Sequence, residues 1–202
     1  MTAGELAAWF NEQGAIGAAL EVVPVRGWRR AGDAARDREG VPGVTADGAT
    51  RDQLALLAAF APVSATGLHV VPGPGKSEVR VAAPWLEARA VADAVADRLI
   101  PGTRGRASTA DVDGREAPAV VIERRDRDSP PAIRTVLAVL AEVHRRMPDR
   151  LAIRAPEFDR LAAGPAIRVA LERGDDPDAA ADRMLGPAME FRTAAQRVRR
   201  YR

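Results

Sequence analysis

The chain has 202 residues, of which 47% are hydrophobic and 29% are charged, and its formal net charge is +2. This composition is typical of a globular protein with one or two cored units, and it excludes an intrinsically disordered chain. Cysteine is absent, which excludes disulfides and thiol catalysis. No apolar run approaches the roughly eighteen residues that a membrane helix needs, and no signal-peptide pattern opens the chain. The chain as written is therefore expected in the cytoplasm, or outside it if the true N-terminus lies upstream.

Two capping boxes and three apolar runs mark the elements of the first 82 residues. The boxes are Thr2–Glu5 and Thr50–Gln53, each with a Glu or Gln three residues after a threonine. In chain order, the pattern predicts a helix from Ala3 to about Gln13, a strand over Leu20–Val25, a loop, a helix to Phe60, and strands over Gly67–Pro72 and Glu78–Ala82.

A long amphipathic helix over Ser129–Met147 organises the second half. Ser129 is a suitable N-cap, and apolar residues recur at three- and four-residue steps from Ile133 onward. Burying that face is worth on the order of 10–15 kcal/mol before ordering entropy is subtracted, so a sheet or helix layer must lie against it. The other predicted elements are a helix over Trp85–Leu99, strands over Thr103–Thr109 and Ala119–Glu123, an extended piece over Leu151–Arg154, and helices over 157–173 (broken near Gly164), 177–185 and 187–200.

Several short motifs point to chemistry that the surrounding sequence does not support. Gly73–Ser77 resembles the end of a P-loop, but prolines remove N–H groups and a strand follows, so a turn or a ligand-facing loop is favoured. Asp111–Gly114 resembles a calcium loop without its later ligands, and a hairpin turn is favoured. His69 and His144 have no partners spaced for zinc and are expected to be structural. The sequence therefore predicts no metal and no cofactor.

Arginine supplies nearly all the positive charge, since Lys76 is the only lysine. An Arg-rich protein that binds nucleic acid is one hypothesis, because arginines pair well with phosphate. The alternative is a solvated helix end whose cations complement the helix dipole, and it is favoured here. The arginines concerned are Arg192, Arg197, Arg199, Arg200 and Arg202.

A series of segments resembles the second half of the NamZ-type exo-β-N-acetylmuramidases, which are peptidoglycan-recycling glycoside hydrolases. The segments follow one another in the family's order over nearly the whole chain. They are Met1–Ala7 (family GMT-x-GELA), Val22–Arg30 (VVPMxGWRR), Ala83–Leu86 (GAPWLD), Arg125–Asp128 with Arg134-Thr135 (TDRD…PVRTGLALL), Phe158–Leu161 with Ala170–Gly174 (FDxL…ALExG), and Phe191–Tyr201 (FRxxRxPYLLY).

The resemblance implies an α/β fold: the remnant of a Rossmann-like catalytic domain over residues 1–84, then a smaller α/β C-terminal domain over 85–202 with a helical C-terminal run. It implies cleavage of terminal N-acetylmuramic acid, with peptidoglycan fragments or muropeptides as ligands. An indole could stack on the sugar and an arginine could pair with its lactyl carboxylate. The residues that survive for substrate binding are Trp28, Arg29, Arg30 and Trp85, and packing is the alternative role for the two tryptophans.

The chain also departs from the family pattern. The family's first half has no counterpart, and two polar loops are replaced by Val41–Thr45 and Val71–Ser77. A glycosidase needs two facing carboxylates, and the sequence nominates no pair, although Glu78 is the nearest candidate by position. The chain is therefore expected to be a truncated relative that is inactive alone. A non-catalytic binding module for muropeptides or peptidoglycan is the alternative.

Truncation has a physical consequence for the first 80 residues. The apolar runs Leu20–Val25 and Leu68–Val71 are of the kind that a doubly wound sheet buries, but most of the covering elements are missing. We therefore expect residues 1–80 to expose an apolar patch, or to pair with a second copy or another chain.

Overall fold

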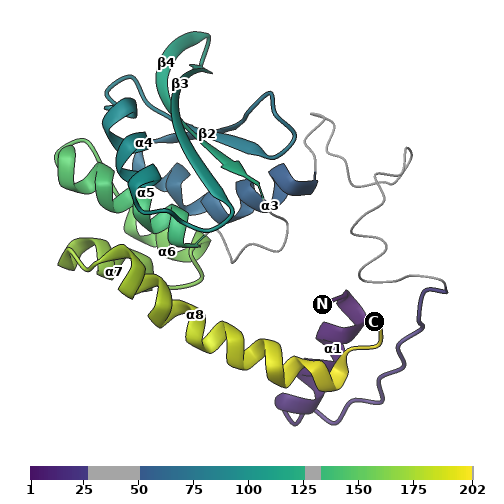
Figure 1. Ribbon diagram of the computed structural model, residues 1–202. Coiled ribbons are helices and arrows are strands. Elements are labelled where there is room, and N and C mark those ends of the chain that lie inside the picture. Colours follow the sequence, from purple (N-terminus) through teal and green to yellow (C-terminus); the bar gives the residue numbers. More distant parts are fainter. Residues whose placement is uncertain (27–50, 126–132, 202) are drawn as a thin grey trace. The chain divides into compact units, whose positions relative to one another are not determined.

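The structure, a computed structural model, describes residues 1–26, 51–125 and 133–201 (Figure 1). The chain divides into two units. The terminal unit comprises Met1–Pro42 and Leu185–Arg202, and the central unit comprises Gly43–Met184. In the part of the chain that the structure describes, no helix has both the length and the apolar character needed to cross a membrane.

The central unit is built on a four-stranded antiparallel sheet with the order β1-β2-β4-β3. Its strands are β1 (His69–Pro72), β2 (Glu78–Ala82), β3 (Thr103–Val112) and β4 (Arg115–Arg124). All four predicted strands of this region are confirmed, and β3 and β4 are longer than expected. Strand β2 pairs with β4 across the predicted boundary near residue 84, and the domain assignment itself stays a prediction.

The β3–β4 hairpin closes through Asp113 and Gly114. Both residues have positive φ, 53° and 77°, as a two-residue hairpin turn of the primed type requires. Asp111 Oδ1 accepts a hydrogen bond from the Gly114 N–H at 3.0 Å. The acidic run that resembles a calcium loop is therefore a hairpin turn, as the sequence favours.

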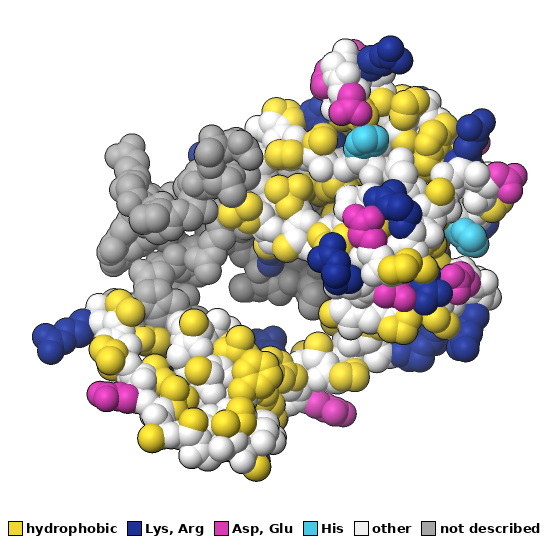
Figure 2. All heavy atoms as spheres, turned by 180° about the vertical axis from the view of Figure 1, so that it is seen from behind, with side chains coloured by type: hydrophobic (Ala, Val, Ile, Leu, Met, Phe, Trp, Pro, Cys, Tyr) yellow, Lys and Arg dark blue, Asp and Glu magenta, His cyan; other side chains and the backbone are white. Residues whose placement is uncertain are grey.

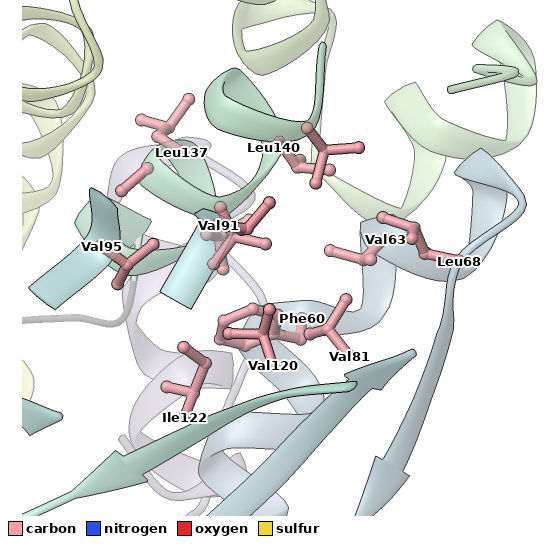
Figure 3. Packing of buried hydrophobic residues seen from close by; sticks show 14 of the residues in the cluster. Phe60, Val63, Leu68, Val81, Val91, Val95, Val120, Ile122, Leu137 and Leu140 are labelled. Carbon is pink, nitrogen blue, oxygen red and sulfur yellow. The ribbon is translucent and has the colours of Figure 1, made fainter. Parts of the chain in front are cut away.

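One face of the sheet is covered by helices. They are α3 (Arg51–Phe60), the 3-10 helix η1 (Ala61–Thr66) and α4 (Ala88–Asp97), with α5 (Ile133–Arg146) packed behind them on α3 and α4. Figure 3 shows side chains of β2 and β4 converging with Phe60, Val91 of α4 and Leu140 of α5. The long amphipathic helix is thus confirmed over the described residues, and a helix layer lies against it. Its predicted cap, Ser129, lies outside the described residues.

Three further helices complete the central unit and run into the terminal one. They are α6 (Ala155–Leu161), α7 (Ala166–Arg173) and α8 (Pro177–Ala194), followed by the short η2 (Ala195–Val198). The predicted break near Gly164 is confirmed. The separate helix predicted from residue 187 is wrong, because α8 continues through Pro187. A proline removes one hydrogen bond, here to the carbonyl of Arg183, and the turns on either side hold the helix together.

The terminal unit ties the two ends of the chain together. Helix α1 (Ala3–Gln13) has the predicted capping box, with Thr2 Oγ1 accepting from the Glu5 N–H and the Glu5 carboxylate accepting from the Thr2 N–H. The Glu5 side chain is fully buried, and its Oε1 also accepts from the Arg200 N–H at 2.9 Å. The Trp9 and Phe191 rings meet edge to face, with centroids 5.0 Å apart.

The strand predicted over Leu20–Val25 is wrong. In the described part of the chain no strand lies beside this segment, so its sequence pattern has no ladder to join. Pro24 lacks an N–H, Val25 donates its N–H to Tyr201 Oη at 2.9 Å, and Val22 packs so closely on Gly4 that a Cβ there would overlap it. The segment therefore lies against α1 as irregular chain.

Candidate functional site

The far face of the sheet, opposite the helices, carries a group of charged side chains. Glu78 of β2 pairs with Glu123 of β4, which pairs with Arg104 of β3, and in the next row Arg80 lies across Val121 from Arg106. Because directly opposed residues of an antiparallel sheet point to the same side, these charges share one face. We call Glu78, Arg80, Arg104, Arg106 and Glu123 the sheet charge cluster.

Glu78 is the buried centre of the sheet charge cluster. Only 8% of its side chain is exposed, and Oε2 accepts a hydrogen bond from Arg106 Nη2 at 3.2 Å. Arg80 Nη2 lies 3.7 Å from Oε1, while its Nη1 donates to the Thr109 carbonyl at 2.6 Å. A buried carboxylate needs such partners, because removing them would leave its charge uncompensated.

A glycine-rich loop seals the other side of Glu78. The loop runs over Gly73–Gly75, and a Cβ on Gly73 would overlap the Glu78 carboxylate. Gln53 of α3 donates from Nε2 to the carbonyls of Gly73 and Gly75, each at 2.7 Å. Its glycines allow a close approach to a side chain, and strand β2 follows it, so it is a turn and not a phosphate loop.

Glu123 is a member of the cluster that sequence reasoning missed. It lies directly across from Glu78, its side chain is 32% exposed, and Arg125 Nε lies 3.8 Å from its Oε2. No local motif marks it, since its position depends on the pairing of β2 with β4. The two glutamates resemble the acid pair of a glycosidase only in residue type. Glu78 is engaged by two arginines and covered by the loop, which makes it a structural counter-ion.

The predicted substrate-binding residues are only partly visible. Trp28, Arg29 and Arg30 lie outside the described residues. Trp85 follows β2, is half-buried and packs against the main hydrophobic core. Packing accounts for part of its surface, and its contact with a sugar stays a prediction.

Ion pairs engage many of the described arginines. The pair between Arg168 and Asp159 is bidentate, with Nε to Oδ1 at 2.9 Å and Nη2 to Oδ2 at 2.7 Å. These hydrogen bonds hold the pKa of Asp159 below its usual range. Similar ion pairs are made by Arg98 with Asp178, Arg134 with Asp182, Arg145 and Arg146 with Glu142, Arg154 with Glu157, and Arg183 with Asp175. Paired arginines are less available to phosphates, which weakens the nucleic-acid hypothesis.

No metal centre is evident among the described residues, where no three His, Asp or Glu side chains gather closely enough to hold an ion. His69 lies exposed at the start of the edge strand β1, and His144 lies in the last turn of α5. The arrangement that remains is a charged sheet face with two partly exposed arginines, 42% for the Arg106 side chain and 20% for that of Arg80. Its chemistry suits anion binding better than acid–base catalysis.

Comparison with solved structures gives the fold a parallel. The structure is similar to a DUF1343 family protein from Bacteroides fragilis NCTC 9343, with a TM-score of 0.70 at 18% sequence identity. The similarity covers 98% of this chain and 56% of that one. At this identity the similarity concerns the fold, and it agrees with the mixed α/β class and the C-terminal helical run expected from the sequence.

Comparison of sequences points to one family. The chain is 26% identical over 180 residues to the peptidoglycan beta-N-acetylmuramidase NamZ of Bacillus subtilis (strain 168), which covers 86% of this chain and 44% of the relative. The chain thus spans less than half the length of that relative. The family model described as "Exo-beta-N-acetylmuramidase NamZ, C-terminal" matches residues 79–201, more than half of the chain. The chain therefore belongs to the NamZ family and corresponds to its C-terminal part.

Proposed function

We propose that this chain is the C-terminal portion of a peptidoglycan-recycling glycoside hydrolase that releases terminal N-acetylmuramic acid, and that by itself it has no hydrolase activity. The family match over residues 79–201 carries this proposal. The Bacillus subtilis relative is named as a peptidoglycan beta-N-acetylmuramidase, and this chain corresponds to 44% of it. The role left to this portion is to help to hold the muramic acid end of the substrate.

The sheet charge cluster supports the absence of activity. A retaining or inverting glycosidase places two carboxyl groups on either side of the scissile bond, roughly 5–9.5 Å apart, with the sugar between them. Here Glu78 is 6% exposed, covered by the Gly73–Gly75 loop and ion-paired to Arg106. A substrate would have to displace that loop to reach it. The catalytic acids are therefore expected to come from the part of the family that this chain does not match.

Substrate binding is proposed to use Trp28, Arg29, Arg30 and Trp85. An indole presents a flat apolar face to a sugar ring, and a guanidinium can bind the lactyl carboxylate through two parallel hydrogen bonds. The half-exposed position of Trp85 beside the core is compatible with one face packed and the other free.

The activity half of the proposal is tested with a chromogenic muramide. The purified 202-residue chain should release no chromophore, while the Bacillus subtilis relative serves as the positive control. Turnover by this chain that disappears in Glu78→Gln would contradict the proposal, because it would make Glu78 a catalytic carboxylate. Turnover that survives Glu78→Gln would also contradict it, and would place the acids elsewhere in the chain.

The binding half is tested by calorimetry with N-acetylmuramic acid. We expect heat of binding for the chain, loss of that heat in Trp28→Ala, and weaker binding in Arg29→Ala or Arg30→Ala. N-acetylglucosamine is the matched control ligand, because it lacks the lactyl carboxylate and should bind more weakly. Absence of heat for N-acetylmuramic acid would count against binding, and equal affinity for both sugars would remove the arginine–carboxylate contact.

A further inference from the structure

The terminal unit exposes an apolar surface. Among the described residues, the large hydrophobic side chains left exposed lie in this unit, except Leu99. Figure 2 shows hydrophobic side chains gathered on this lobe, with charged side chains at its margins. The surface is formed by Met1, Leu6, Phe10, Ile16, Leu20, Val23, Val25, Met189 and Phe191, and we call it the terminal apolar surface.

Helix α1 contributes a regular stripe to this surface. Glu5 and Trp9, four residues apart, face inward, where Glu5 is fully buried and Trp9 meets Phe191. On the opposite side, Ala3, Leu6, Ala7 and Phe10 follow the spacing of a single helix face, and all of them are exposed. Phe10 is 57% exposed and Leu6 is 40% exposed. A helix with one stripe packed and a second apolar stripe open is shaped for a partner on its outer side.

The segment Leu20–Val25 adds strand-like backbone to the same unit. Its sequence is that of a buried strand, yet no strand lies beside it in the described part of the chain. Val22 faces Gly4 of α1, while Val23 and Val25, two residues apart, are 81% and 64% exposed. An exposed segment of this kind readily accepts a neighbouring strand, because a partner supplies hydrogen bonds and covers alternate side chains.

The comparisons indicate what covers this surface. The Bacillus subtilis relative matches 86% of this chain, but the match uses only 44% of the relative, and the solved Bacteroides structure is matched over 56% of its length. Since this chain corresponds to the C-terminal part, the relatives carry an additional N-terminal portion of comparable size. A folded portion of that size offers the sheet edge and the apolar face that Leu20–Val25 and α1 lack.

We propose that the terminal apolar surface is the docking surface for a polypeptide equivalent to the N-terminal portion of these relatives. The partner packs on Leu6 and Phe10 of α1 and adds a strand beside Leu20–Val25. This contact is one between folded polypeptides, and it does not depend on the activity proposed above.

The test is co-expression of the full 202-residue chain with the N-terminal portion of the Bacillus subtilis relative that precedes the matched region. We expect the two polypeptides to co-elute as a one-to-one complex, and hydrogen exchange of residues 3–25 to slow in the complex. Phe10→Glu and Val23→Glu should each weaken the complex by about tenfold or more. Leu99→Glu is the matched control, because Leu99 is 84% exposed but belongs to the central unit, and it should change nothing.

Three results would overturn the proposal. They are failure to co-elute, a complex that is insensitive to Phe10→Glu and Val23→Glu, and a homodimer of this chain that those two variants dissociate. A single-chain fusion, with the relative's N-terminal portion placed before Met1, provides a second measurement. Hydrogen exchange over residues 3–25 that is as fast in the fusion as in the isolated chain would also overturn it.

Discussion

The central and terminal units treat similar apolar sequence in opposite ways. In the central unit, apolar residues of the strands and helices reach full burial, as at Phe60, Val120 and Leu140. In the terminal unit, residues with the same character stay open, and Val23 is 81% exposed. Helix α1 and helix α5 are both amphipathic, yet the apolar face of α5 meets a helix layer while the outer stripe of α1 meets no described element.

The difference shows that periodicity specifies which face of an element is apolar but not what covers it. The central unit holds its covering elements within Gly43–Met184. The terminal unit has an inner contact, built by Glu5, Trp9 and Phe191, and an outer surface that lacks one. The first unit is thus expected to be stable by itself, and the second to gain stability from a partner. Four changes would break or sharpen this contrast.

The largest effect is expected from truncating a core aromatic side chain. Phe60→Ala should lower the free energy of unfolding by about 3–5 kcal/mol, because the side chain is fully buried among Val81, Val120 and Val91. Phe10→Ala, at a side chain that is 57% exposed, should cost less than about 0.5 kcal/mol. Urea denaturation followed by circular dichroism measures both. Equal losses would mean that Phe10 is covered in solution.

A smaller loss is expected at the loop over Glu78. Gly73→Ala should cost about 1–3 kcal/mol, because the new methyl group overlaps the Glu78 carboxylate and displaces it from Arg106. The effect should shrink in a Glu78→Ala background, where the space is free. Gly186→Ala is the matched control, since it lies in open space within α8 and should stabilise the helix by roughly 0.5–1 kcal/mol. If Gly73→Ala were neutral, the loop would not lie on Glu78.

The link between the chain ends should respond to loss of Glu5. Glu5→Ala removes the acceptor for the Thr2 N–H at 2.7 Å and the Arg200 N–H at 2.9 Å. We expect the terminal unit to lose about 1–2 kcal/mol of local stability, while the central unit keeps its own. Hydrogen exchange of α1 should then speed up by about tenfold, whereas exchange of β4 should not change. Glu12→Ala, on the exposed side of the same helix, is the control; an equal effect there would remove the buried carboxylate as the cause.

The smallest effect is a pH dependence within the central unit. The pKa of Asp159 is lowered by its hydrogen bonds to Arg168, so this carboxylate contributes stability above its unfolded pKa of about 3.9 and loses that contribution as the pH falls through its native pKa. Asp159→Asn should therefore lower the urea midpoint at pH 7, and the gap to the wild type should close as the pH drops below about 4. Glu172→Gln leaves this pair intact and should change the midpoint less. A gap that is constant with pH would rule out the ion pair as the source.

The sequence predicts most of the fold, because local signals decide most of it. The capping box at Thr2, the apolar spacing of α5 and the alternation in β2 and β4 each depend on residues a few positions apart. The failures occur where distant chain decides. Leu20–Val25 has a strand sequence, but a strand exists only beside a neighbour. Pro187 carries the usual signal for a new helix, but α8 tolerates it.

The candidate site is less predictable for the same reason. Glu78 attracts attention by its position, but its partner Arg106 is 28 residues away, and Glu123 joins it only through the order of strands in the sheet. The role of Gly73 is also tertiary, since its missing side chain makes room for a carboxylate. Binding by Trp28, Arg29, Arg30 and Trp85 stays a prediction.

The hydrogen bond between Glu5 and Arg200 has a consequence for synthesis of the protein. Its partners are 195 residues apart, so helix α1 leaves the ribosome long before the chain end that completes its inner contact. At a translation rate of about 5–20 residues per second, the interval is roughly 10–40 seconds. During that time, both apolar stripes of the nascent helix are open to chaperones. The first residues to be made are therefore among the last to acquire their native environment.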